Sequence, residues 1–485
     1  MQNRHPKALP YLFLTELWER FGFYVVQVML VLYMTKAYGF SDDKSFTISG
    51  LFAALAYISP LVGGYLADRV LGFKVAIVWG GAFLIIGYAL LALPFHHLFY
   101  LALATIIVGN GLFKPNVSSL LGALYEPGDS ARDTGFTIFY VGINLGVLLA
   151  GVSSGYIKDH FGWHAGFALA SIGLLIGLAI FSIGNNRVGM HYPYEPTLSN
   201  HKWFAKYWLL LYCLIAIAFV CLLLQSEILG KWFLPAVGVV LLFFVFKLAL
   251  KQKGDYRGNL LTLNILIISS IIFWALFLQM FLSTNLFIER LIDRNISGTV
   301  IPTTVFYALE SVFVILLGPL FAWGWSALNR SDRNPSPVMK FVFAIIFAGL
   351  GCLTLAVSTQ FVSSDHLINP MWIVLAYLLI TIGELLLSPI GLSAVTMLSP
   401  PHLAGLMMGV WFTALGFGGQ LAGALAKIAS IPDNAQNPLA ELPIYHNAYL
   451  IYAYLAFGIA VLLFAVHCVF RKSLQARFCP GGTDG

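Results

Sequence analysis

Apolar segments recur from one end of this chain to the other, and they constrain its fold more than any other feature of the sequence. Most are about 20 residues long, which is the length that an α-helix needs to cross a hydrocarbon core of about 30 Å. Only 10% of the 485 residues are charged, whereas a soluble domain carries about 25%. The sequence therefore predicts an all-α membrane protein.

We expect fourteen transmembrane helices, separated by stretches rich in glycine, proline and charged residues. The even number places both termini on the same side of the membrane. The predicted spans cover residues 10–35, 46–67, 73–93, 97–122, 134–157, 163–184, 205–225, 231–250, 261–288, 302–325, 338–359, 370–398, 403–429 and 446–470.

The distribution of lysine and arginine favours cytoplasmic termini. With both termini inside, eighteen of the 27 Lys and Arg residues lie in cytoplasmic segments and seven lie in external ones, while Arg20 and Lys114 lie within spans. Cytoplasmic loops are enriched in these residues. The start of the chain lacks the pattern of a cleavable signal peptide. We therefore expect a multi-pass protein of the bacterial inner membrane.

Residues 187–257 differ from the sequence on either side. The polar stretch HYPYEPTLSNHKWF leads into two apolar helices, and the charged stretch KQKGDYRGN follows them. Without this hairpin the chain has six helices before it and six after it, which is the plan of transporters that bind a substrate between two halves. We expect an N-terminal six-helix bundle at 1–186, an inserted transmembrane hairpin at 187–257 and a C-terminal six-helix bundle at 258–485.

The composition argues against several other classes of protein. The pI is about 8.9, but the basic residues form no dense stripe of the kind that binds nucleic acid. The five cysteines are scattered and odd in number, so we expect neither a disulfide framework nor a metal site. No cluster typical of an enzyme is evident in the sequence, and we expect no organic cofactor.

Six ionisable residues lie inside predicted spans, where each charge costs about 2.5–3.5 kcal/mol on insertion scales. Because such charges are disfavoured in lipid, they are candidates for function. They are Glu16, Glu19 and Arg20 in the first span, Lys114 in the fourth, Glu310 in the tenth and Glu384 in the twelfth.

The first span carries a compact group of charges. Glu16 and Arg20 are four residues apart and Glu19 adjoins Arg20, so one helical face presents two carboxylates beside a guanidinium. Protonation of a carboxylate would release Arg20 to bind an anion, which couples a proton to a substrate. A static ion pair is the alternative, but it does not need a second carboxylate. We interpret this group as a proton-coupling site.

The charges of the two halves suit a zwitterion. The first half contributes two negative and two positive groups, and the second contributes two negative groups and no cation. A di- or tripeptide of roughly 7–10 Å would direct its carboxylate toward Arg20 and Lys114 and its ammonium toward Glu384. Lys114 lies in GNGLFKPN, whose glycines and proline permit a close approach of helices.

Other polar and aromatic residues are candidates for the substrate path. Asn144 and Gln279 lie mid-span, where they either contact a peptide or bond across helices for about 0.6 kcal/mol. Asp68 and Arg69, at the inner end of the second span, form either a cytoplasmic gate or a helix-end ion pair. The aromatic candidates are Tyr24, Tyr57, Trp274 and Trp411.

The segment ELWERFGFY at 16–24 resembles the ExxERF-x-[FY]-Y motif of the proton-dependent oligopeptide transporter (POT) family, within the major facilitator superfamily. The resemblance implies two six-helix bundles with an inserted hairpin, as in bacterial members. It also implies a proton-coupled symporter that imports di- and tripeptides by alternating access. Further similar segments are GGYLADRVLG (63–72), GLFKPNVSSLLGALY (111–125), FYVGINLG (139–146), FWALFLQ (273–279), GELLLSPIGL (383–392) and MGVWF (408–412).

The resemblance also implies roles for individual residues. Glu16, Glu19 and Arg20 match the proton-coupling cluster of the family. Arg20, Lys114 and Tyr24 match contacts to the peptide carboxylate, and Glu384 and Asn144 match contacts to its amino group. Tyr57, Trp274 and Trp411 match aromatic residues that line the substrate cavity.

The sequence departs from the family pattern at three places. Gln27 stands where many members have a second arginine, so the positive pole of the cavity is weaker. Phe277 and Leu278 precede Gln279 where many members have an acidic residue. Glu310 stands where the family often has an asparagine. We expect Glu310 to take over part of the missing acid's role in proton coupling or to shift substrate preference toward cationic peptides.

Two other functions stay open on the sequence alone. The chain is either a family member adapted to another solute, such as an amino acid derivative or nitrate, or a nutrient sensor that does not transport. Nitrate fits less well because Glu310 and Glu384 repel anions. A channel would not need the Arg20 switch. We expect a monomer that binds small peptides and protons.

Overall fold

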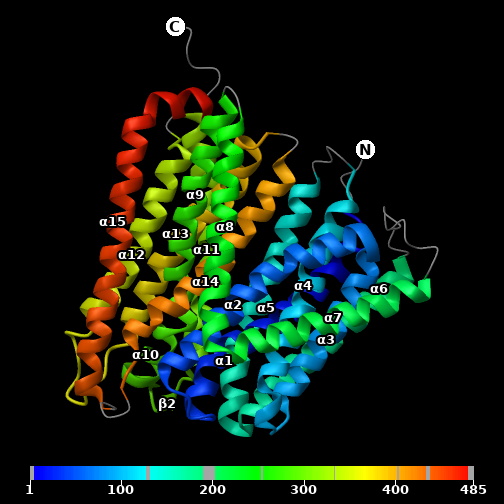
Figure 1. Ribbon diagram of the computed structural model, residues 1–485. Helices are drawn as coiled ribbons and strands as arrows, with labels where there is room; N and C mark the ends of the chain where they lie inside the picture. Colours follow the sequence, from blue (N-terminus) through cyan, green and yellow to red (C-terminus); the bar gives the residue numbers. More distant parts are fainter. Residues whose placement is uncertain are drawn as a thin grey trace. The chain divides into compact units, whose positions relative to one another are not determined.

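The apolar blocks of the sequence form long helices in the computed structural model (Figure 1). Within the described part of the chain, thirteen helices are long and apolar enough to span a membrane. A further long helix, α14, has 23 residues and no charged side chain. The helices lie close to the predicted spans. The structure describes residues 5–126, 131–188, 202–252, 255–331, 334–400, 403–432 and 437–478.

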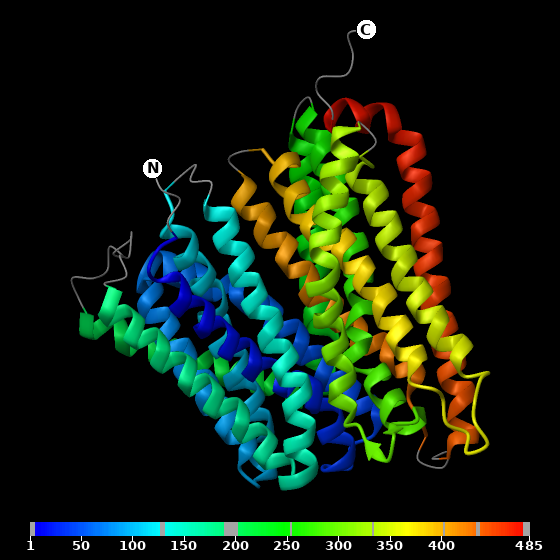
Figure 2. The same cartoon turned by 180° about the vertical axis from the view of Figure 1, so that it is seen from behind.

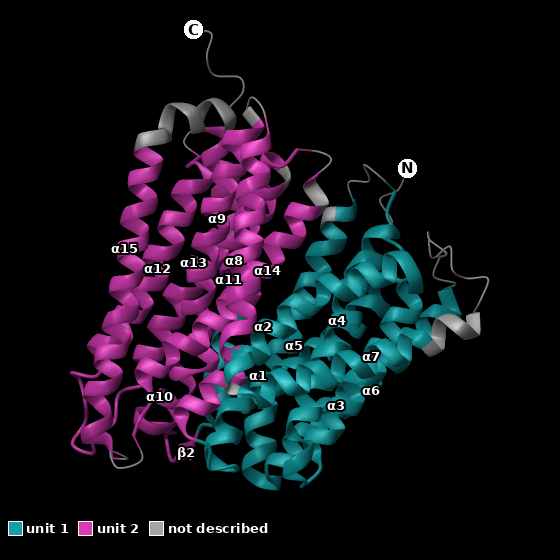
Figure 3. Cartoon of the chain, in the orientation of Figure 1, with its two compact units in different colours: residues 1–40, 51–230, 301–312 teal, residues 41–50, 231–300, 313–485 magenta. Residues whose placement is uncertain are grey.

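The chain divides into two compact units (Figure 3). Unit 1 comprises residues 1–40, 51–230 and 301–312, and unit 2 comprises residues 41–50, 231–300 and 313–485. Three helices therefore contribute to both units. Helix α2 begins in unit 2 and continues in unit 1, whereas α8 and α11 begin in unit 1 and continue in unit 2.

Small residues bring the helices of unit 1 together. Gly142 of α5 faces the ring of Phe13, and Gly146 leaves no room for a side chain beside Leu17 and Arg20 of α1. Such small residues let helix backbones approach closely in a membrane. The helices that lie entirely or mostly in unit 1 are α1 (Leu9–Lys36), α2 (Asp42–Leu66) with the π-helical turn Ala67–Leu71, α3 (Phe73–Ala92), α4 (Phe99–Ala123) after the short turn His96–Leu98, α5 (Ala131–Phe161), α6 (Trp163–Val188) and α7 (Lys202–Gln225).

The motif GNGLFKPN brings α4 close to α2 and α3. A side chain at Gly63 of α2 would overlap the backbone of Gly111, and one at Gly80 of α3 would meet the backbone at Gly109. The close approach that the sequence predicts for these glycines is confirmed. It places Asn110 and Lys114, on the same helix, against α1 and α2.

Unit 2 contains most of the second half of the sequence. Helix α12 packs between α13 and α15, and α9 packs against α14; both views show α12 beside α15 (Figures 1 and 2). Helix α12 begins where Ser336 accepts a hydrogen bond from the N–H of Met339, which is a typical N-cap. The elements are α8 (Glu227–Lys251), α9 (Asp255–Phe277), the 3-10 turn Leu278–Phe281, α10 (Ser283–Leu291), β1 (Asn295–Ile296), β2 (Thr299–Val300), α11 (Thr303–Arg330), α12 (Pro337–Ser358), α13 (Met371–Leu398), α14 (Ala404–Ala426) with the turn Lys427–Ala429, and α15 (Pro438–Phe478).

The predicted span at 261–288 is interrupted in the structure. Helix α9 ends at Phe277, and α10 begins at Ser283 after a 3-10 turn. The break contains neither glycine nor proline. Instead, Gln279 donates hydrogen bonds to the carbonyl of Ala275 and to that of Ala422 in α14, and Ser283 donates to Gln279 at 2.6 Å. Side-chain hydrogen bonds thus replace part of the helical ladder, and no local sequence signal marks that exchange.

The predicted hairpin divides between the two units. Helix α7 packs against α4 in unit 1, whereas Gly238 of α8 faces the ring of Phe417 of α14 in unit 2. Most of the polar stretch before α7, residues 189–201, lies outside the described residues, as does Cys479. The three-part division into two bundles and an inserted hairpin stays a prediction.

Candidate functional site

Arg20 and Glu19 form a buried ion pair on α1. The Nε and Nη2 atoms of Arg20 each donate a hydrogen bond of 2.5 Å to the Glu19 carboxylate. Both side chains are almost fully buried, with 2% and 0% of their surface exposed. Desolvation makes an isolated buried charge costly. The two charges are therefore held as a bidentate pair, the strongest geometry available to a guanidinium and a carboxylate.

Glu16 supplies the second carboxylate, as predicted. Its Oε1 lies 3.6 Å from Arg20 Nε, one helical turn away, and its Oε2 is buried without a hydrogen-bond partner among the described residues. Lys114 of α4 experiences the charges of Glu16, Glu19 and Arg20, and its Nζ lies 4.8 Å from the centre of the Tyr57 ring. These four charged side chains sum to zero when all are ionised. The site therefore has no spare cation for a further anion.

Asn110 is a member of this site that the sequence analysis missed. Its Oδ1 accepts a hydrogen bond of 3.2 Å from Arg20 Nη2, and its Nδ2 donates one of 2.7 Å to the carbonyl of Ala56 in α2. It is 1% exposed and lies one turn before Lys114. That spacing, a polar residue four positions before an intramembrane lysine, is the sequence signal that would have found it.

Tyr88 of α3 is a second missed residue. It is fully buried, and its hydroxyl has no hydrogen-bond partner in the described part of the chain. Its ring packs against the backbone at Gly22, and the charges of Glu19 and Arg20 act on its hydroxyl. A hydroxyl without a partner beside the Arg20–Glu19 ion pair is available to hydrogen-bond Glu19 when Arg20 changes partner.

Aromatic residues cover one side of the charged group. Tyr24 stacks on Tyr307 with ring centres 5.9 Å apart, and a side-chain hydrogen bond joins Tyr24 to Tyr57. Arg20 lies over the Phe23 ring at 5.0 Å. Tyr24 and Tyr57 therefore meet beside Arg20 and Lys114, the residues to which the sequence analysis assigns the peptide carboxylate.

Glu310 lies in unit 1, in the first turns of α11. The charge count by halves of the sequence placed it with the second half, which differs from its place in the structure. Glu310 is 5% exposed, and its carboxylate accepts a hydrogen bond of 3.1 Å from the Ser311 hydroxyl. The charge of Glu310 acts on the hydroxyl of Tyr24. Unit 1 thus holds three of the four intramembrane carboxylates named by the sequence analysis, because the start of α11 folds against α5, where Thr304 donates a hydrogen bond to Gly151.

Two further predicted residues of unit 1 are buried. Gln27 is 5% exposed, and its Oε1 has no hydrogen-bond partner among the described residues. Asn144 is also 5% exposed and donates to the carbonyl of Tyr140 in its own helix at 3.0 Å. Within the described residues neither side chain has a hydrogen bond to another helix, so the Gln27 carbonyl and the Asn144 Oδ1 stay candidates for substrate contacts.

Unit 2 contains the other predicted binding residues. Glu384 lies on α13, beside Gly383, which packs against Ala344. The ring of Trp411 on α14 fills the space above Gly391 and meets Phe341 edge-on at 6.0 Å. Trp274 of α9 meets Phe273 and Phe277 edge-on.

Gln279 and Trp411 are the most constrained of these side chains. All the hydrogen bonds of Gln279 described above are internal to unit 2, and Trp411 is 6% exposed. Of the two roles left open for Gln279, the helix-bonding one is therefore present in this structure. Their assignment to the substrate site stays a prediction.

Asp68 and Arg69 lie on the π-helical turn that ends α2, and both are exposed. Within the described residues they form no ion pair with each other, so the helix-end ion pair is not present. The gating role stays a prediction. A single-turn π-helix is a frequent feature of functional positions in long helices.

A family model described as the POT family matches residues 74–443, most of the chain. The chain belongs to the POT family. The dipeptide and tripeptide permease A of Chromobacterium violaceum is 36% identical over 452 residues, which cover 92% of this chain and 90% of that relative. The peptide transporter YePEPT of Yersinia enterocolitica is 35% identical over 447 residues, which cover 87% of each chain.

Solved structures of POT-family transporters have the same fold. The crystal structure of a peptide transporter POT in complex with sulfate matches with a TM-score of 0.83 at 30% identity and covers 97% of this chain and 96% of that one. A mutant transporter of the same description, in complex with alafosfalin, matches with a TM-score of 0.84 at 30% identity and the same coverage. The predicted major facilitator fold and the predicted family are both confirmed.

Proposed function

We propose that this chain is a proton-coupled symporter that imports di- and tripeptides across the bacterial inner membrane by alternating access. Relatives at 36% and 35% identity are named as a dipeptide and tripeptide permease and as a peptide transporter. A structural relative holds alafosfalin. The observation that carries the proposal is the bidentate pair of Arg20 with Glu19, backed by the second carboxylate of Glu16.

The charge balance of this group gives the coupling a physical basis. Glu16, Glu19, Arg20 and Lys114 are neutral as a set, so a bound peptide carboxylate would leave a net negative charge in a buried site. That charge is costly at low dielectric. A proton on Glu16 or Glu19 restores neutrality and frees hydrogen-bond donors of Arg20 for the peptide. Proton and peptide are therefore bound together more favourably than either one alone.

The remaining contacts follow from the same logic. Arg20, Lys114 and Tyr24 bind the peptide carboxylate, and Glu384 binds the amino group with help from Asn144. Gln27 and Glu310 take part in substrate binding, and Glu310 also takes part in proton coupling. Tyr57, Trp274, Gln279 and Trp411 line the path, and Asp68 and Arg69 act at the cytoplasmic gate. Both termini are cytoplasmic, the hairpin lies between two six-helix bundles, and the transporter works as a monomer without metal or organic cofactor.

Transport by purified protein tests this proposal. Uptake of labelled dialanine into proteoliposomes is measured with an imposed inward proton gradient for the wild type, Glu19→Gln and Glu384→Gln. We expect the wild type to accumulate dialanine and both variants to lose gradient-driven accumulation. Asp43→Asn is a matched control, because Asp43 is 57% exposed and pairs with Lys427 outside this site. Accumulation by Glu19→Gln at the wild-type level would contradict the proposed coupling.

One observation favours a second candidate. Gln27 stands where many family members have a second arginine, and its buried side-chain carbonyl has no hydrogen-bond partner among the residues that the structure describes. A family member adapted to another solute, such as an amino acid derivative, would fit a weaker positive pole. If wild-type vesicles show no dialanine accumulation but accumulate another small zwitterion, the fold assignment stands and the substrate assignment is replaced.

A further inference from the structure

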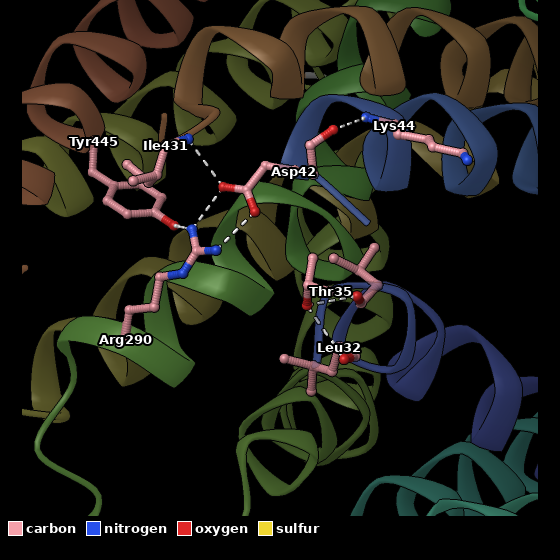
Figure 4. A network of polar contacts seen from close by, with 9 residues as sticks. Leu32, Thr35, Asp42, Lys44, Arg290, Ile431 and Tyr445 are labelled. Atoms are coloured by element: carbon pink, nitrogen blue, oxygen red, sulfur yellow. Dashed lines mark hydrogen bonds and ion pairs between the residues drawn. The ribbon is translucent and has the colours of Figure 1, made fainter. Parts of the chain in front are cut away.

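A second group of ionisable side chains lies in unit 2, and none of its members belongs to the candidate site. Arg290 of α10 holds Asp42, in the first turn of α2, through two hydrogen bonds of 2.7 Å (Figure 4). Asp42 also accepts a hydrogen bond of 3.0 Å from the N–H of Ile431, and the Arg290 guanidinium donates to the Tyr445 hydroxyl at 3.1 Å. Asp42 is 5% exposed. Asp42 is therefore largely desolvated, whereas the Arg290 side chain is 23% exposed.

Glu441 adds a second carboxylate to this pair. It lies in the first turn of α15, four residues before Tyr445, so the two side chains share one face of the helix. Glu441 is 6% exposed, and its Oε2 has no hydrogen-bond partner among the described residues. The charges of Arg290 and Asp42 both act on it. Two buried carboxylates thus face one guanidinium, which already holds Asp42.

Two other cations among the described residues of unit 2 already pair with carboxylates. Lys427 pairs with Asp43 at 2.8 Å, and Arg294 pairs with Glu289 at 3.3 Å. Tyr445 also faces Glu441, and a tyrosine is neutral at ordinary pH. An ionised Glu441 would leave an uncompensated charge in a buried position, and such a charge is strongly disfavoured.

We propose that Glu441 is a proton-binding site. When Glu441 is protonated, the Arg290 guanidinium pairs with Asp42 alone. When Glu441 loses its proton, its carboxylate competes with Asp42 for the guanidinium. Asp42 is part of the first turn of α2, so the proton on Glu441 controls how firmly the start of that helix is held. In the proposed topology this group lies at the external ends of the helices, on the side from which protons enter. Its effect on transport rests on the proposed function, but the proton binding itself does not.

Infrared spectroscopy tests the proton directly. Spectra of purified protein at pH 5 and pH 8 are subtracted to detect the carbonyl stretch of protonated carboxyl groups, in water and in heavy water. We expect the wild type to show a band that is absent from Glu441→Gln. The control variant Asp43→Asn, which removes the acid next to Asp42 on α2, should retain the band. Identical difference spectra for the wild type and Glu441→Gln would overturn the proposal. A band that sodium chloride removes at constant pH, and that potassium chloride does not, would also overturn it in favour of a cation site.

A second measurement tests the consequence for the Asp42–Arg290 pair. The rate of dialanine counterflow, which needs no net gradient, is measured against external pH. We expect the counterflow rates of the wild type and Glu441→Gln to be equal at pH 5. Between pH 5 and pH 8 the wild-type rate should change by a factor at least three times as large as the factor for Glu441→Gln. A pH profile for Glu441→Gln that coincides with that of the wild type would overturn the coupling to α2. If the wild type carries no dialanine, the infrared result still decides whether Glu441 binds a proton.

Discussion

Asn110 of α4 accepts a hydrogen bond from the guanidinium of Arg20 of α1, with 3.2 Å between Asn110 Oδ1 and Arg20 Nη2. The two residues are ninety positions apart in the sequence. The same side chain donates to the carbonyl of Ala56, so a single amide joins α1, α2 and α4. Arg20 is therefore oriented from two sides, by Glu19 on its own helix and by Asn110 on another. A guanidinium held in this way returns to one defined position after each exchange of partners.

We predict that Asn110→Ala lowers dialanine uptake several-fold. Loss of a hydrogen bond between helices costs about 0.6–1.7 kcal/mol, and loss of one to a charged group costs about 1.5–3 kcal/mol. Initial uptake rates and dialanine affinity measure the effect. Asn116→Ala is the matched control on α4, because in the described part of the chain Asn116 donates only to the carbonyl of Leu112 in its own helix. Equal losses in both variants would show that Asn110 has no special role.

We predict that Arg20→Lys abolishes peptide binding although the charge is kept. A lysine ammonium cannot reproduce the fork that bonds both oxygens of Glu19 and also reaches Asn110. Thermal stabilisation by dialanine measures the effect, and we expect none for this variant. Lys114→Arg is the converse exchange and keeps a cation over the Tyr57 ring. Wild-type stabilisation of Arg20→Lys would show that a point charge is sufficient.

We predict that Tyr88→Phe slows uptake without lowering the melting temperature. A buried hydroxyl without a partner costs about 1–3 kcal/mol, so its removal leaves stability unchanged or raised. Uptake falls if the hydroxyl serves Glu19 while Arg20 changes partner. Tyr452→Phe gives the opposite pattern of stability, since the Tyr452 hydroxyl donates to the Leu425 carbonyl at 2.8 Å. Unchanged uptake by Tyr88→Phe would exclude a part in the exchange.

We predict that Gly63→Ala is destabilising and that Gly64→Ala is tolerated. A methyl group at Gly63 would overlap the backbone of Gly111, which cannot move aside, whereas one at Gly64 would meet the Pro115 side chain at an ordinary 3.6 Å. Overpacking of this kind costs about 1–3 kcal/mol. Melting temperatures of the two purified variants give the comparison. Equal values would mean that α2 and α4 are not in close contact at Gly63.

The sequence predicted the helices well because the bilayer imposes the same requirement on each of them. Every span needs about 20 apolar residues and internal backbone hydrogen bonds. The charges in the first span were also predictable, since Glu16 and Arg20 are one turn apart on the same helix. Local spacing alone determines that relationship.

Relationships between distant segments could not be predicted in this way. The sequence analysis counts Arg290 only among the basic residues of the external segments, yet it forms a part-buried ion pair with Asp42, 248 positions away. The break after Phe277 depends on Gln279 reaching Ala422 of another helix. Glu310 joins unit 1 because the start of α11 packs there. Each of these features depends on tertiary packing, which a single sequence without an alignment does not reveal.

The last prediction concerns Glu310 of α11. Its charge acts on Tyr24, and Tyr307, one turn before it on α11, stacks on the Tyr24 ring. A carboxylate beside this ring attracts cationic side chains of a bound peptide and offers a further place for a proton. We predict that Glu310→Gln lowers the preference for lysine-containing dipeptides over dialanine and weakens the dependence of uptake on the proton gradient. Competition of both peptides against labelled dialanine, with and without the gradient, measures the two effects.

Glu126→Gln removes an exposed carboxylate outside the spans and controls for net charge. Because glutamine can still accept the hydrogen bond from Ser311, the variant keeps its local packing, and an unchanged preference together with an unchanged gradient dependence would assign Glu310 a purely structural role.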